Sequence, residues 1–438
     1  MSRLGTLWRT VRHLRPVQVI GRARLYLWHR PQVDKRPAPP LRAATGHWVA
    51  CAGREASLVG PERFRFLSVE HALAEVGWDD PKVARLWRYN LHYFDDLNAQ
   101  GAAQRSASHR ALLDRWLADN PPPTGTAWEP YPVSLRIVNW IKWFLAGAHP
   151  EPAWLHSLAV QARWLGQHLE WHLLGNHLFA NAKALVFAGL YFDGDEARHW
   201  LQTGLRILQR EIPEQILADG GHFERSPMYH ALALEDLLDL LNLLQARAPA
   251  GSPAANLQAT LREHAARMLQ WLHCMSHPDG TVGLFNDAAH GIAPDNTALD
   301  AYAARLGVVA GTIEDGVRPL QPSGYVRVTR GAVRALLDCA PIGPDYLVGH
   351  AHADTLAFEL SLHGRRLIVN GGTSCYGLDA QRLHERGTAW HSTVQVAGAN
   401  SSEVWSGFRV GRRARVIRSQ VQGWSVLAAH DGYHHLAG

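Results

Sequence analysis

The sequence predicts a helical N-terminal part followed by an antiparallel β part, and three observations carry that prediction. The 438 residues exceed a typical single domain. Apolar residues recur at helical spacing from about residue 67 to residue 310. After Gly311 they give way to short alternating or apolar runs bounded by glycine. This order indicates two separately packed parts: helix pairs that suggest an incomplete α/α toroid, and strands that suggest a β-sandwich.

The helical elements are expected in the following order. Residues 1–60 form a basic, proline-punctuated and irregular segment with one short helix near Thr6–Leu14. The toroid is expected over residues 61–312. Two of its helices carry apolar side chains at helical spacing, namely Leu135, Val138, Ile141 and Leu145 in one and Leu155, Leu158, Ala162, Leu165 and Leu169 in the next. Further helices are expected at about 176–191, 195–210, 228–248 and 255–276.

The β-sandwich is expected over residues 313–438. Alternating or short apolar runs predict strands at 325–330, 333–338, 356–362 and 366–370. Little chain follows this change of period, and sandwiches of this kind often need more strands. We therefore expect a truncated or partial sandwich.

Composition narrows the classes of function. An apolar fraction of 47% and a charged fraction of 19% describe a globular protein with an ample core. Arginine far outnumbers lysine, which suits bidentate recognition of carboxylates or sulfates. The basic residues are spread along the chain without a nucleic-acid motif, so we expect no nucleic-acid partner. No apolar stretch is long enough to span a bilayer. The oligomeric state cannot be read from the sequence.

Two histidines, His350 and His352, are the most informative residues. They lie in the predicted β part, separated by Ala351, and a strand would project both imidazoles from one face. Such a pair suits either two metal ligands or one ligand beside a proton-transfer group. The competing interpretation is a pair of buried, hydrogen-bonded histidines.

Three other segments combine polar residues in ways that core packing does not demand. Asn176 and His177 stand at a predicted helix start, where asparagine is commonly an N-cap. Tyr229 follows a glycine-containing loop and falls in the first turn of a helix, where a purely structural tyrosine is the alternative. The third comprises residues 369–377 together with residues 387–394, which include His391.

Taken together, these segments resemble the heparinase II/III-like polysaccharide lyases, a family with an α/α toroid and a β-sandwich. The resemblance extends to the segments 87–95 and 128–140 and so covers most of the chain. It implies β-elimination at a uronic acid of an acidic polysaccharide. Such an enzyme removes the proton next to the carboxylate and expels the glycosidic oxygen one carbon further on.

The resemblance also implies roles for individual residues. The amide of Asn176, assisted by His177, would neutralise the substrate carboxylate, which stabilises the enolate-like transition state. Tyr229 and His350 would supply the base and the acid. Tyrosine serves as both in syn elimination, whereas a histidine base with a tyrosine acid suits anti elimination, and the sequence does not choose between them.

A metal site is the second implication of the resemblance. By motif position its ligands would be His352, Asn370 and His391, holding zinc or a similar divalent cation in a structural role, and no organic cofactor is expected. The family has an aspartate where this chain has Asn370, and a neutral amide is a poorer zinc ligand than a carboxylate.

Substrate contacts are expected from two places. Arg225, oriented by His222 and Glu224, is the more plausible partner for a carboxylate or sulfate. Trp128 and Arg136 stand in a stretch that could line a groove, although their helical spacing is equally typical of packing positions.

Competing functions remain open at this stage. A glycoside hydrolase on the same scaffold would use carboxylates such as Glu129, Asp219 or Glu224, but no flanking pair stands out. A non-catalytic polysaccharide-binding protein of capsule or exopolysaccharide production is a further alternative. Lyases that this chain resembles are commonly periplasmic or secreted, yet no secretory signal is recognisable, so a cytoplasmic location is also open.

Overall fold

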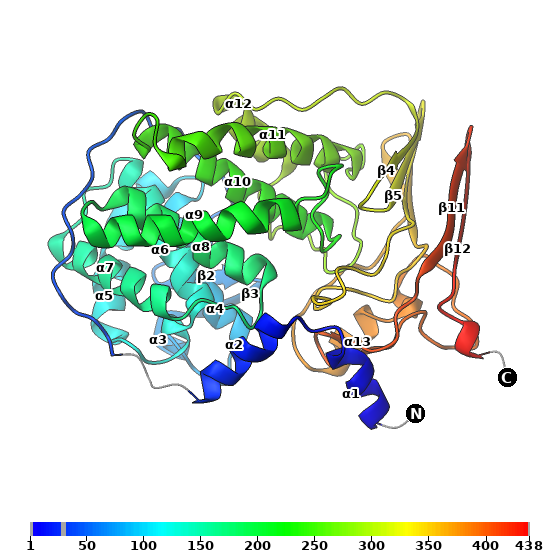
Figure 1. The fold of residues 1–438 in the computed structure, drawn as a ribbon, viewed down its shortest axis with the longest axis horizontal. Helices are drawn as coiled ribbons and strands as arrows, with labels where there is room; N and C mark the ends of the chain where they lie inside the picture. Colours follow the sequence, from blue (N-terminus) through cyan, green and yellow to red (C-terminus); the bar gives the residue numbers. More distant parts are fainter. Residues whose placement is uncertain (1–2, 28–31, 437–438) are drawn as a thin grey trace. The chain divides into compact units, whose positions relative to one another are not determined.

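The computed structural model describes residues 3–27 and 32–436 (Figure 1). The chain divides into two compact units. We call residues 17–212 and 236–262 the helical unit, and residues 1–16, 213–235 and 263–438 the mixed unit. The chain passes from one unit to the other at the start of α2 (Pro16–Leu27) and within three long helices: α9 (Asp195–Gln215), α10 (Pro227–Arg247) and α11 (Pro253–Cys274). The linear boundaries at residues 60 and 312 stay a prediction.

The helical unit is built around two buried helices, α6 (Pro130–Leu145) and α8 (Gly175–Tyr191). α6 starts with a proline at its first position, where the missing N–H costs nothing. α8 is apolar nearly all round, which is typical of a helix packed in the centre of a domain. Lys142 of α6 and Lys183 of α8 both donate to the buried Asp239 of α10, at 2.8 and 2.7 Å. The remaining elements of this unit are α2 (Pro16–Leu27), β1 (Leu58–Gly60), β2 (Arg63–Phe66), β3 (Val69–Ala72), α3 (Leu73–Val76), α4 (Arg85–Tyr93), α5 (Ser106–Asp119) and α7 (Pro152–Gln167).

The helix predictions are confirmed for the long elements. The helices expected at 176–191, 195–210, 228–248 and 255–276 are α8 to α11, and the two apolar series lie in α6 and α7. Two expectations near the N-terminus are wrong. Residues 16–27 form α2 rather than irregular chain, and residues 58–72 form a small antiparallel sheet where helices were expected to begin at about 67. Short strands with few residues leave too weak a period to detect.

The mixed unit contains an antiparallel sheet in which neighbouring strands follow one another in sequence, from β4 to β8. These strands are β4 (Gly316–Leu320), β5 (Tyr325–Arg330), β6 (Val333–Asp338), β7 (Phe358–Leu362) and β8 (Arg365–Ile368). One face of the sheet packs on α11, where Tyr325 and Leu336 join Trp271 and Met275 in a buried cluster. Further elements are α1 (Arg3–Val11), α12 (Asn296–Arg305), α13 (Ala380–Glu385), β9 (Val404–Trp405), β10 (Arg409–Val410) and the hairpin of β11 (Val416–Gln422) and β12 (Ser425–His430). The predicted order, a helical region followed by antiparallel sheets, is confirmed.

The segment that carries His350 and His352 is not a strand. It is irregular chain between β6 and β7, and β7 begins only at Phe358. The backbone of the segment bonds to other loops instead of to a strand: the Ala353 N–H donates to Arg386 O, and the Asp287 N–H donates to His350 O. The expectation that both imidazoles share one strand face is therefore wrong. In the described parts of the chain, no helix is both long and apolar enough to cross a lipid bilayer.

Candidate active site

A tyrosine and a histidine form the centre of the candidate site, and both belong to the mixed unit. Tyr229 is the third residue of α10, which Pro227 opens. Its ring stacks on that of His350, with 3.9 Å between the ring centroids and 12° between the planes. The imidazole is 16% exposed, so solvent or a ligand can reach it. The stack places two groups able to move protons side by side.

Glu224 fixes the imidazole of His350 from the protein side. Its carboxylate is 2% exposed and accepts a short hydrogen bond from Nδ1 of His350. A carboxylate only accepts, so the proton of neutral His350 resides on Nδ1 and the lone pair on Nε2. Nε2 is therefore the nitrogen that can take a proton.

The buried side chain of Arg225 stabilises the loop before α10 through hydrogen bonds to backbone oxygens. This differs from its expected role as the partner of a substrate carboxylate or sulfate. That side chain is buried and donates to backbone oxygens, from Nε to Ser323 at 2.9 Å and from Nη1 to Phe223 at 3.2 Å. Burial lowers the pKa of Arg225. The Tyr325 hydroxyl donates to Arg225 O at 2.6 Å. Because Nε and Nη1 donate to backbone oxygens, Arg225 stabilises the loop, which favours a structural role over binding of a substrate anion.

The expected partners of Arg225 also have other contacts. Glu224 binds His350, as described. The backbone N–H of His222 donates to His230 Nδ1 at 3.2 Å, and the His222 ring is 1% exposed. Burial lowers the pKa of His222 to about 4, so this imidazole is neutral at pH 7. His222 is thus a core residue of the loop, and only Glu224 reaches the tyrosine–histidine pair.

Asp287 connects the segments that carry this pair, and sequence reasoning missed it. Its backbone N–H donates to His350 O at 3.0 Å, and its backbone oxygen accepts from Ser226 Oγ, just before α10, at 2.5 Å. Its carboxylate accepts from His352 Nε2 at 2.6 Å and from both Nη atoms of Arg382. The signal available in the sequence was the polar pair Asn286–Asp287 directly after Phe285.

The charge of Asp287 is maintained by its partners. Burial alone favours the neutral acid, but the His352 hydrogen bond and the Arg382 guanidinium hold the pKa of Asp287 well below its usual value. Arg382 also lies over the ring of Tyr376, with 5.2 Å to the centroid. Burial raises the pKa of Tyr376, and its hydroxyl interacts with that of Tyr229. The Tyr229 hydroxyl therefore lies near a cation and a second phenol.

Asn176 and His177 lie in the helical unit, and each is half-buried in the first turn of α8. The position before this helix is taken by Leu174, at φ 65°, so Asn176 is not the N-cap. The ring of His177 lies against that of Tyr131, with 4.5 Å between centroids, and Nδ1 contacts Glu170 Oε1 at 3.0 Å. Burial favours the neutral acid, but His177 and other polar neighbours lower the pKa of Glu170.

Trp128 and Arg136 are buried, which favours the packing alternative over contact with substrate. Trp128 is 4% exposed and donates from Nε1 to Asn120 O at 3.1 Å. Arg136 is fully buried, and its three nitrogens donate to Gln161 Oε1, His92 O and Ala127 O at 2.8 to 3.2 Å. Both residues stabilise the helical unit.

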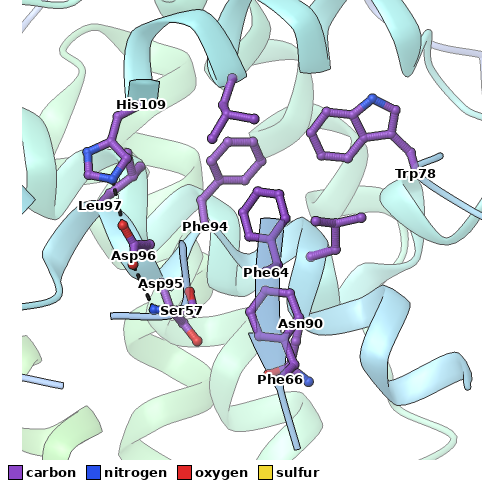
Figure 2. Close-up of a pocket in the computed structure, with 12 residues that line it drawn as sticks. Ser57, Phe64, Phe66, Trp78, Asn90, Phe94, Asp95, Asp96, Leu97 and His109 are labelled. Atoms are coloured by element: carbon purple, nitrogen blue, oxygen red, sulfur yellow. Dashed lines mark hydrogen bonds and ion pairs between the residues drawn. The ribbon is translucent and has the colours of Figure 1, made fainter. Parts of the chain in front are cut away.

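A separate small pocket lies elsewhere in the helical unit (Figure 2). Phe64, Phe66 and Phe94 form much of its apolar wall, and none of its lining residues is a predicted site residue. On one side Asp96 accepts from His109 Nε2 at 2.7 Å and from the Ser57 N–H at 2.8 Å. The carboxylate is thereby engaged by structural partners.

The predicted metal ligands do not have the contacts that a zinc site requires. Nδ1 of His352 lies 3.1 Å from Nε2 of His391, and burial lowers the pKa of His391 to about 4. Asn370 Oδ1 already accepts from the Ser392 N–H at 2.9 Å. Among the described residues, no group of three or more His, Cys, Asp or Glu side chains could hold a metal ion. Two imidazoles and an engaged amide fit zinc poorly. Metal binding here stays a prediction.

Comparison with known proteins identifies the family. The model of the heparinase II/III N-terminus matches residues 75–303, and that of the heparinase II/III-like C-terminal domain matches residues 314–438. The chain belongs to the heparinase II/III-like family. A solved structure of heparinase III has the same fold, with a TM-score of 0.62 and 23% identity over 81% of this chain and 60% of that one.

Curated relatives in this family have different names. A heparin-sulfate lyase of Bacteroides thetaiotaomicron is 30% identical and matches 66% of this chain and 47% of its own length. The FtsZ-localized protein C of Caulobacter vibrioides is 27% identical and matches 82% of this chain and 62% of its own length. The chain thus spans less than two thirds of the length of each relative.

Proposed function

We propose that this protein is a polysaccharide lyase that cleaves an acidic, uronate-containing polysaccharide by β-elimination. The stacked Tyr229–His350 pair with its buried Glu224 is the observation that carries the proposal. Core packing gives no reason to combine a partly exposed imidazole, a phenol stacked on it and a buried carboxylate. General acid–base catalysis needs such groups within reach of one proton.

The proposed reaction moves one proton and breaks one carbon–oxygen bond. A base takes the proton from the carbon next to the uronate carboxylate. The electron pair forms a double bond to the adjacent carbon, the glycosidic oxygen leaves from that carbon, and an acid protonates it. Either Tyr229 performs both transfers, or Nε2 of His350 accepts the proton and Tyr229 donates. The first route needs only Tyr229 for proton transfer and the second needs both residues. No water attacks in either route.

Asn176 and His177 are assigned to the substrate carboxylate. A carbon acid next to a carboxylate is weakly acidic while that group keeps its full charge, so donors aimed at it lower the barrier. The side chain of Asn176 is a neutral donor at the half-buried start of α8. The assignment predicts that Asn176→Ala affects turnover more than binding.

The deciding experiment follows the product. The protein is incubated with heparan sulfate, hyaluronan and alginate, and unsaturated uronate ends are detected by their ultraviolet absorbance. We expect such ends with at least one acidic polysaccharide and none with Tyr229→Phe. New reducing ends without ultraviolet absorbance would instead indicate hydrolysis. Hydrolysis is less well supported because Asp219 and Glu224 are both engaged, by Ser323 and His350.

Polysaccharide binding without turnover is the second candidate. It is favoured by Asn370, which replaces the carboxylate expected from the family resemblance. Retained binding of an acidic polysaccharide, with no unsaturated product and no effect of Tyr229→Phe, would support this function over the lyase.

A further inference from the structure

Helix α1 packs on the mixed unit through its polar side. Thr6 Oγ1 donates to Glu403 Oε1 at 2.7 Å, and Arg9 donates to both oxygens of Glu403 at 2.9 Å. One turn on, Thr10 Oγ1 accepts from Trp405 Nε1 at 3.0 Å. Burial opposes the charge of Glu403, but Arg9 and Thr6 lower its pKa to about 2. The inward face of α1 is therefore fixed by an ion pair and hydrogen bonds.

The outward face of α1 is apolar, the reverse of the usual arrangement in a surface helix. Its side chains recur at helical spacing and are strongly exposed: Leu4 78%, Leu7 42%, Trp8 65% and Val11 39%, with Leu14 at 39% in the turn that follows. Single exposed apolar residues are ordinary, but a row along one helix is not. A row of this kind needs a partner that accepts apolar side chains.

The charge around this face indicates the kind of partner. From Arg3 to Arg15, the segment that contains α1 and the turn after it, the chain has no acidic residue, whereas arginines occur at positions 3, 9, 12 and 15. Arg12 is exposed and flanks the apolar row. Burial lowers the pKa of the adjacent His13, as do the positive charges of Arg413, Arg12 and Arg415, with Asp345 opposing them. The surroundings of α1 are thus rich in cations.

We propose that α1 is an interfacial helix that inserts Leu4, Leu7, Trp8 and Val11 among the headgroups of an anionic lipid bilayer. A strongly amphipathic helix with tryptophan and leucine on one side and arginine beside it is the expected composition of such a helix. Arginine next to the apolar row attracts lipid phosphate, and tryptophan is favoured at the headgroup level. A second copy of the chain fits less well, because pairing two such faces would bring the arginines together.

Vesicle binding by the full chain tests the proposal. The probes are vesicles of three parts phosphatidylcholine to one part phosphatidylglycerol, and vesicles of phosphatidylcholine alone. We expect co-sedimentation with the anionic vesicles, at least about tenfold weaker binding to neutral vesicles, and weakening by salt. Trp8→Glu should weaken binding at least about tenfold. Trp424→Glu is the matched control, since Trp424 is 52% exposed between β11 and β12.

Three outcomes would overturn the proposal. The protein could stay in the supernatant with anionic vesicles, or Trp424→Glu could lose as much binding as Trp8→Glu. A dimer that Trp8→Glu dissociates, with no vesicle binding, would replace the bilayer by a second copy. Far-UV circular dichroism shows whether each variant is folded, and Arg12→Glu, on an exposed side chain, gives an independent reduction of anionic binding.

Discussion

His350 and His352 are two residues apart in one loop, yet their exposure and their neighbours differ. His350 is 16% exposed, binds Glu224 through Nδ1 and stacks on Tyr229. His352 is fully buried and lies between Asp287 and His391. Each imidazole has a carboxylate partner, so the partner does not distinguish them. Exposure distinguishes them, because of the two only His350 is partly accessible to solvent. The buried His352 has a structural role in its contacts with Asp287 and His391.

The largest expected effect is the loss of activity when either member of the proposed proton-transfer pair, Tyr229 or His350, is replaced. Tyr229→Phe and His350→Ala should each reduce kcat/KM on a cleaved polysaccharide at least about a thousandfold, because each removes a group that moves a proton. Initial rates of ultraviolet absorbance measure this. His363→Ala, in the exposed turn between β7 and β8, is the control. Near-normal rates in both variants would refute their assignment.

The next largest effect is a loss of stability when the buried carboxylate of Asp287, the partner of His352 and Arg382, is replaced. Asp287→Asn should lower the free energy of unfolding by about 3 to 5 kcal/mol, since it leaves the buried Arg382 guanidinium without its counter-charge. Urea denaturation measures this change. Asp345→Asn removes an ion pair between Asp345 and Arg413. Because the Asp345 carboxylate is 76% exposed, the free energy of unfolding should fall by less than about 1 kcal/mol. Equal losses in the two variants would contradict the contrast between buried and exposed pairs.

Glu224→Gln sharpens the comparison on the His350 side. An amide can accept from or donate to Nδ1, so it no longer fixes the tautomer, and it does not stabilise the imidazolium. We expect kcat to fall roughly a hundredfold with KM little changed, and the pH–rate profile to shift. Glu263→Gln, whose carboxylate is 66% exposed, is the matched control. An unaltered pH profile with a lower melting temperature would indicate a merely structural role.

Asp338 gives a smaller, pH-dependent effect in the same unit. Burial and the neighbouring Asp354 raise its pKa well above the usual value. The folded state therefore holds this proton where the unfolded chain releases it. The contribution to stability is complete below about pH 4 and is lost, by up to about 1.4 kcal/mol per pH unit, as pH rises through the folded pKa. Compared with wild type, Asp338→Asn should show a flatter stability profile between pH 4 and 7.

Metal content is the smallest expected effect and tests the surroundings of His352 again. We expect little zinc in the wild-type chain after dialysis and more in Asn370→Asp, which supplies a carboxylate at the third predicted ligand position. Elemental analysis measures this content. One zinc per wild-type chain that both His391→Ala and Asn370→Ala abolish would show instead that Asn370 serves as a ligand.

The long helices could be predicted because their signal is local. The apolar period that places α8 and α10 spans only a few turns, so no distant contact is needed to read it. The loop of His350 was mistaken for a strand because histidine alternates there with small residues, which mimics a period of two. Its true partners are distant: Glu224 is 126 positions from His350, and Asp287 is 65 from His352. Pattern reasoning has no access to such pairings.

The same limit explains the outcomes at individual site residues. Tyr229 and Asn176 were placed correctly in the first turns of their helices, because loops and helix starts leave local marks. The sequence could not predict the burial of Arg225 or decide between packing and substrate contact for Arg136, since an arginine that donates to backbone oxygens looks the same in sequence as one that binds a sulfate. Distinguishing them requires knowing which carbonyls lie nearby.

Asp287 links the loop of His350 to Ser226, just before α10, through its own backbone N–H and carbonyl, while its carboxylate binds His352 and Arg382. Most replacements at this position would thus remove the carboxylate contacts with His352 and Arg382 and keep the backbone hydrogen bonds to His350 and Ser226. Proline, which lacks an amide hydrogen, would sever the link to His350. Comparing proline with asparagine at one position can therefore tell geometric alignment of the two rings apart from rigidity of the unit that carries them.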